Sequence, residues 1–114
     1  MCNMSRPMTA LYVGGMGARG KNFYNELFAG YGYEKEAKEI QDLYLDGKRE
    51  AAAAAIPDSF MEATTLIGPE GFVKDRWSAQ KESGVTTQNV ILTGSTTRDR
   101  IQTLEKLRNL VETI

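Results

Sequence analysis

The sequence predicts a mostly α-helical chain with one or two short strands, of the kind that ends a larger α/β protein. Apolar residues recur at helical spacing through most of its 114 residues, and glycines and prolines stand at the boundaries of these stretches. Only residues 86–93 have a clear strand composition. One strand cannot satisfy its own backbone groups, so the order of elements favours a segment whose sheet is completed elsewhere.

Three helices are predicted in the first half of the chain. Residues 21–28 form a short amphipathic pattern that stops at the glycines at 30 and 32, and the stretch YEKEAKEIQDLYLDG predicts a second helix that ends at Asp46 and Gly47. The third helix is KREAAAAAIPD, which is rich in alanine and leaves the helical conformation near Ile56 because Pro57 follows.

The second half contains the predicted strand between two helices. A helical turn starts near Pro57, and residues 64–67 are expected to be briefly extended. A helix then runs from Pro69 to the Gly84 cap, the strand TTQNVILT occupies 86–93, and a closing helix begins at a capping box at Thr96 and continues to the end.

Charge and composition exclude several classes of function. The chain has 14 basic and 15 acidic residues, and this net charge of -1 offers no field for nucleic acid or an anionic membrane. The absence of histidine removes His-based nucleophilic catalysis and most zinc sites, so no metal is expected. Cys2 has no disulfide partner, and the N-terminal apolar run is too short for a signal peptide or a span. The cytoplasm is therefore the expected location.

The glycine cluster YVGGMGARGKNFY matches two phosphate-binding patterns. Gly15, Gly17 and Gly20 satisfy G-x-G-x-x-G, and Gly15 to Lys21 satisfy the G-x-x-x-x-G-K part of a P-loop. The P-loop requires Ser or Thr after its lysine, whereas this chain has Asn22, and a helix is predicted where a dinucleotide fold requires an acidic second strand. A glycine break between helices is the favoured interpretation, and a phosphate loop is the weaker alternative.

Methionines and tyrosines are concentrated in the first half. Met4 and Met8 are four residues apart, which is typical of a packed helix face. The five tyrosines form either a stacking surface or a core with polar edges, and a core is favoured because few basic residues accompany them. They are Tyr12, Tyr24, Tyr31, Tyr33 and Tyr44.

The ordered set of motifs resembles the C-terminal portion of the luciferase-like monooxygenases, in the branch that uses the deazaflavin coenzyme F-420. The set comprises GGMG, NFY, a helix starting at GY, the alanine-rich helix closed by PDSF, LIGPEGFVKDRW and ESGVTTQNVIL. The resemblance implies a TIM barrel, which takes about 250 residues, so residues 1–114 would supply only its last part. Residues 6–67 would be a helical region, and 68–114 a helix, the last barrel strand and the closing helix.

The resemblance also implies a cofactor and a position for it. The expected cofactor is coenzyme F-420, with flavin mononucleotide as the less favoured choice, and the expected ligand is a small organic substrate. No catalytic residue of the family maps onto a motif here. Because TIM-barrel sites lie at the C-terminal ends of strands, Thr93, Gly94 and Ser95 are the candidate cofactor-binding residues.

Two functions follow from these expectations. In the first, the chain is the C-terminal segment of a deazaflavin-dependent oxidoreductase and is inactive alone, because it lacks most of a barrel. In the second, it is a non-catalytic remnant or helical module that is stabilised by self-association or by a partner subunit, since the strand edge and the apolar faces around Phe72, Trp77 and Leu107 would need cover.

Overall fold

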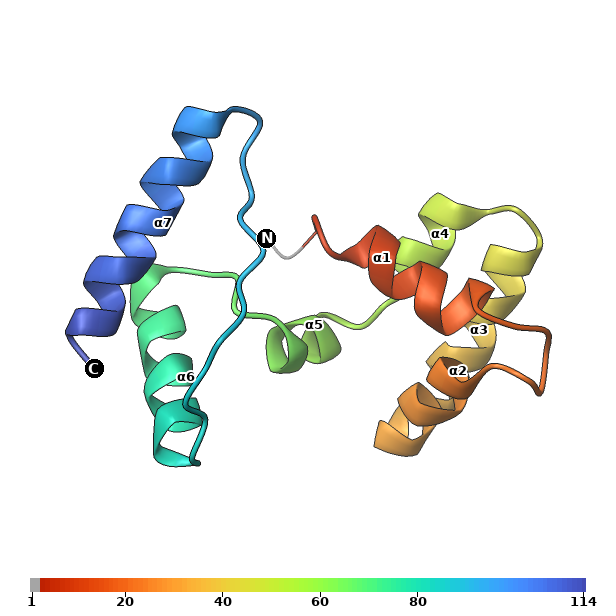
Figure 1. Ribbon diagram of the computed structural model, residues 1–114. Coiled ribbons are helices and arrows are strands. Elements are labelled where there is room, and N and C mark those ends of the chain that lie inside the picture. Colours follow the sequence, from red (N-terminus) through yellow and green to blue (C-terminus); the bar gives the residue numbers. More distant parts are fainter. Residues whose placement is uncertain (1–2) are drawn as a thin grey trace. The chain divides into compact units, whose positions relative to one another are not determined.

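The computed structural model describes residues 3–114, and this part of the chain is built of helices and connecting segments (Figure 1). The elements are α1 (Arg6–Ala10), a π-helical turn η1 (Leu11–Gly15), α2 (Phe23–Phe28), a kinked turn η2 (Ala29–Tyr33), α3 (Glu34–Leu45), α4 (Arg49–Ala54), α5 (Asp58–Thr64), α6 (Glu70–Glu82) and α7 (Thr97–Glu112). They group into two compact units, the first ending at Ile67 and the second beginning at Gly68.

The predicted helices form, with small shifts at their ends. The first begins at Phe23, because the side chain of Asn22 accepts a hydrogen bond from the backbone of Asn25 and caps it. The break predicted at the two glycines falls at Gly32, whose φ of 98° interrupts the helical path before α3. The closing helix is capped as predicted, since Thr96 Oγ1 accepts from the amide of Asp99 at 3.1 Å.

The core of the first unit lies around α3. This helix packs against both η1 and α4. The buried apolar side chains come from five helices, from η1 and from the segment between α4 and α5: Ala10, Val13, Phe28, Ala37, Ile40, Ala52, Ile56 and Met61. The rings of Phe28 and Phe60 meet edge to face at 4.6 Å between centroids, which fixes α5 against α2.

The prediction that the methionines and tyrosines are core residues is wrong for most of them. Met8 is 59% exposed because α1 turns Ala10 toward the core and leaves its other side uncovered, and Met4, which precedes α1, is 68% exposed. Tyr12, Tyr24 and Tyr31 are exposed as well. Only Tyr33 and Tyr44, the remaining two tyrosines, pack against the core.

The second unit has a smaller buried region. Its buried apolar residues are Val73 of α6 and Leu110 of α7, while Trp77 is half-buried. Lys81 Nζ donates to the backbone oxygen of Ile114 at 2.8 Å and so joins the end of α6 to the end of the chain. No helix in the described part of the chain is long and apolar enough to cross a membrane.

The strand predicted for residues 86–93 does not form in this chain. Residues 85–94 follow a path without regular structure, and Ile91 is 96% exposed. Residues 64–67, the second strand candidate, do not form a strand either, although Thr65 has an extended backbone. The physical reason is that a strand needs a neighbour for its amides and carbonyls, and residues 3–114 contain no other strand.

Candidate functional site

The glycine cluster lies between two helical elements, as predicted, and its glycines allow close backbone contact. A Cβ on Gly14 would lie 2.5 Å from the Cβ of Tyr44, and one on Gly15 would lie 2.4 Å from Cε1 of the same ring. A Cβ on Gly17 would lie 2.5 Å from the carbonyl oxygen of Lys21. These positions therefore need glycine for packing against α3 and for a tight turn.

Asparagine side chains hold this turn in place. Nδ2 of Asn22, which is 1% exposed, donates to the carbonyls of Tyr12 and Val13, both at 3.1 Å. Nδ2 of Asn25 donates to Val13 at 3.0 Å and to the carbonyl of Ala37 at 2.8 Å. The π-helical turn η1 departs from the regular helical hydrogen-bond ladder. The side-chain amides of Asn22 and Asn25 bond to carbonyls within this turn.

This geometry does not suit a phosphate. A phosphate is an acceptor and binds backbone N–H donors at the junction of a strand and a helix. Here the residues before Gly15 are helical, and the carbonyls of Tyr12 and Val13 are themselves occupied by asparagine donors. The overlap with two nucleotide-binding patterns is therefore a coincidence of glycines that packing requires.

The nearby charges anchor the loop to α3. Asp42 accepts from Arg19 Nε at 2.9 Å and from Lys38 Nζ at 2.8 Å. The hydrogen bond from Lys38, followed by that from Arg19, lowers the pKa of Asp42 below its ordinary value. Arg19 thus has a carboxylate partner within the chain.

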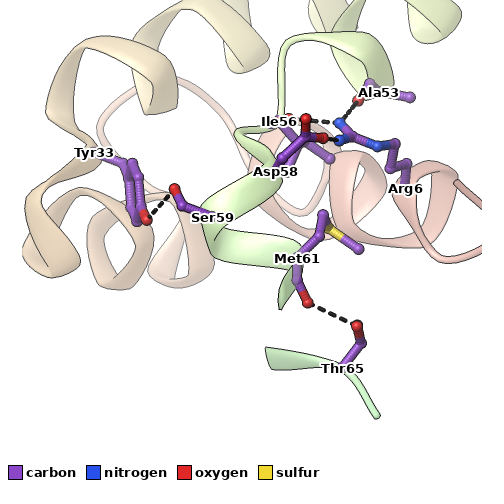
Figure 2. A network of polar contacts seen from close by, with 8 residues as sticks. All are labelled: Arg6, Tyr33, Ala53, Ile56, Asp58, Ser59, Met61 and Thr65. Carbon is purple, nitrogen blue, oxygen red and sulfur yellow. Dashed lines mark hydrogen bonds and ion pairs between the residues drawn. The ribbon is translucent and has the colours of Figure 1, made fainter. Parts of the chain in front are cut away.

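A groove with a volume of about 1020 Å³ lies between α1 and α4 in the first unit. Its walls are mainly apolar, and they include Met8 and Leu11 from α1 and alanines from α4. The side chain of Arg6 is 12% exposed at this groove and donates to the carbonyls of Ala53 and Ile56 and to Asp58 (Figure 2). Arg6 therefore caps the C-terminal end of α4.

Sequence reasoning did not find this groove. The available signal was the alanine run, because small side chains leave space where larger ones would fill it, and three consecutive alanines, Ala53 to Ala55, line the groove. Arg6 has no partner near it in the sequence, since its acceptors are about 50 positions away at Ala53 and Ile56. Only folding brings them together.

The groove does not fit a deazaflavin coenzyme on its own. Such a coenzyme combines a planar ring with an anionic tail, and anions are held by cationic side chains or backbone N–H groups. Arg6 is occupied by three acceptors within the chain, and Arg49 lies over the ring of Tyr44 at 5.5 Å with Glu50 next to it. The residues that line the groove thus provide no cluster of free cations for the tail.

The candidate residues Thr93, Gly94 and Ser95 lie just before α7. The carbonyl of Gly94 accepts from Arg100 Nε at 3.2 Å, and Ser95 Oγ donates to Asp99 at 3.3 Å. All three residues are exposed, and none of them lines the groove. Their proposed contact with a cofactor stays a prediction.

A metal site is also not found among the described residues. Among the described residues, no three histidine, cysteine or acidic side chains lie close enough together to hold a metal ion. Cys2, the single cysteine, lies outside the described residues.

Comparison with known proteins decides the family. Residues 4–87 match the profile of the luciferase-like monooxygenases. The chain belongs to the luciferase-like monooxygenase family. Over 90 residues, or 79% of its length, it is also 32% identical to a Mycobacterium tuberculosis (strain ATCC 25618 / H37Rv) protein named as a candidate coenzyme F-420-dependent oxidoreductase. No solved structure gives a significant match.

The matches cover only part of the mycobacterial relative and only part of this luciferase-like chain. Its aligned stretch covers 26% of the mycobacterial relative. The family profile ends at residue 87, so Thr93, Gly94 and Ser95 lie beyond it. The glycine turn, the asparagine pair and α6 fall within the matched residues, and so do all residues that line the groove except Asn3.

Proposed function

We propose that the chain is the C-terminal segment of a deazaflavin-dependent oxidoreductase, an enzyme that moves a hydride between coenzyme F-420 and a small organic substrate. The observation that carries this proposal is the identity of 32% to the mycobacterial protein named for that coenzyme. In the complete enzyme the segment would close a TIM barrel in the cytoplasm, with residues 6–67 as a helical region and 86–93 as the last strand.

Two structural observations support the proposal that the chain is one part of a larger barrel. Residues 86–93 have strand composition but no strand partner within residues 3–114, and Ile91 is almost fully exposed. The groove between α1 and α4 lacks free cations for an anionic coenzyme tail. Both features are expected if other parts of a barrel supply the neighbouring strand and most of the coenzyme contacts, so the chain alone would be inactive.

A chimera tests this proposal. The chain replaces the aligned stretch of the mycobacterial relative, and the affinity for oxidised coenzyme F-420 is measured by the change in its fluorescence. We expect the chimera to bind the coenzyme about as tightly as the parent relative, and the isolated chain not to bind. A folded chimera that has lost the coenzyme would contradict the proposal.

The same chimera tests Thr93 and Ser95. Replacing both by alanine should weaken coenzyme binding, whereas Thr87→Ala, a control on the same irregular segment, should leave it unchanged. Equal affinity of all variants would remove the two residues from the site.

A second candidate function is a non-catalytic helical module that is stabilised by self-association. The observation that favours it is the set of large apolar side chains left uncovered on α1 and α2, such as Phe23 at 68% exposure. A cooperatively folded chain, together with a chimera that folds without coenzyme affinity, would favour this function over the first.

A further inference from the structure

The first unit is held together by contacts between residues that are far apart in the sequence. Its eight buried core residues all lie between residues 10 and 61. The hydrogen bonds of Arg6 reach residues 47 to 52 positions away, and they join α1 to the end of α4 and the start of α5 (Figure 2). The side chain of Asn25 likewise joins η1 to α3. The first helix of this unit is therefore tied to its last helix through a core that the unit itself provides.

The second unit has much weaker internal contacts. Residues 68–114 are all described, and Val73 and Leu110 are their buried apolar side chains. The hydrogen bond from Lys81 to Ile114 spans 33 positions and is exposed. The other side-chain hydrogen bonds of this unit join residues no more than six positions apart, so they stabilise helix ends rather than the packing of α6 with α7.

The segment between α6 and α7 has the composition of a strand but no strand pairing. Residues 85–94, VTTQNVILTG, contain no charge and no proline, and six of the ten are β-branched. The amide of Val85 donates to the carbonyl of Gln80 at 3.1 Å, whereas the amides of residues 86–93 make no hydrogen bond to another backbone group of residues 3–114. Nothing in the second unit thus holds this segment in one conformation.

We propose that the second unit opens separately from the first, so that residues 86–93 can change from an irregular segment to a strand while the core of the first unit stays folded. Proteins open in cooperative units, and a unit with few buried apolar contacts opens more often than one with many. The separate opening is a property of this chain. The strand rests on the proposed function, because the other strands of a complete barrel would supply its hydrogen-bond partners.

Hydrogen–deuterium exchange of the full chain, followed by mass spectrometry, tests the separate opening. We expect the amides of α6 and α7 to exchange at least about tenfold faster than those of α3. Leu110→Ala should speed exchange in α6 and α7 and leave α3 unchanged, whereas Ile40→Ala should speed exchange in α3 and leave α7 unchanged. The two variants are matched, since both remove a large apolar side chain that is buried in its own unit (5% and 0% exposed).

Two results would overturn the separate opening. One is equal protection of α3 and α7 in the wild-type chain, and the other is an effect of Leu110→Ala that extends to α3. Either result would mean that the two units open as one.

Exchange in the chimera with the mycobacterial relative tests the change to a strand. We expect the amides of residues 86–93 to exchange at least about tenfold more slowly in the chimera than in the isolated chain. A chimera that binds the coenzyme while these amides stay unprotected would overturn the strand and leave the oxidoreductase proposal in place. A chimera that protects them without binding the coenzyme would contradict the oxidoreductase proposal alone, so the two proposals fail separately.

Discussion

Replacement of Asn22 by alanine should destabilise the first unit more than any exposed substitution. The side chain is 1% exposed, and its oxygen accepts from the amide of Asn25 as the cap of α2. Its Nδ2 also donates to the carbonyls of Tyr12 and Val13 in η1. Alanine removes the cap and both donated bonds at once.

The expected magnitude follows from these contacts. Loss of a helix cap costs about 1 kcal/mol, and a buried carbonyl left without its donor costs about 1 to 2 kcal/mol. Val13 keeps a donor in Asn25, so only the carbonyl of Tyr12 loses its side-chain donor entirely. The sum is about 2 to 3 kcal/mol of unfolding free energy.

Urea unfolding can assign this loss to the first unit. All five tyrosines lie before residue 68 and the single tryptophan, Trp77, lies after it, so the near-ultraviolet tyrosine signal follows the first unit and tryptophan fluorescence the second. The tyrosine transition should move to lower urea in Asn22→Ala and stay in place in Asn109→Ala, an exposed control on α7. A change below about 0.5 kcal/mol, the usual effect of surface substitutions, would refute the reasoning.

Three further predictions concern the packing and charges of the first unit. Gly14→Ala should cost about 1 to 3 kcal/mol because its Cβ would overlap α3, whereas Gly30→Ala, whose Cβ meets no atom within 4 Å, should be neutral or stabilising in the same urea assay. Arg6→Ala should lower the unfolding free energy by about 2 kcal/mol, since buried carbonyls at the end of α4 lose a charged donor, and an unchanged urea midpoint would exclude this capping role. Because the folded-state pKa of Asp42 lies below that of the unfolded chain, its stabilising contribution is complete above the ordinary aspartate pKa and is lost as the pH falls through the lowered value. The urea midpoint should therefore fall more steeply with acid in the wild type than in Asp42→Asn, and parallel curves would contradict the assignment.

Helix positions could be predicted from the sequence because their signals are local. Thr96 caps α7 through Asp99, three residues away, and Pro57 ends the alanine-rich helix through its own ring. The glycine break was also predictable, since positive φ and close contact are properties of glycine itself. These features need no knowledge of distant residues.

The groove and the exposed faces could not be predicted in this way. The cap on α4 is Arg6, whose acceptors lie about 50 residues away in the chain. Periodicity identifies an apolar face, but it does not say whether anything covers that face, and Tyr31 is 64% exposed for this reason. The strand over 86–93 depends in the same way on a neighbour that residues 3–114 do not provide.

The most direct test of the account is a titration of oxidised coenzyme F-420 with the chimera of this chain and its mycobacterial relative. The account predicts saturable binding with an affinity close to that of the parent relative, and no binding by the isolated chain under the same conditions. A chimera that folds cooperatively and fails to bind the coenzyme would contradict the claim that this chain is a segment of a deazaflavin-dependent oxidoreductase.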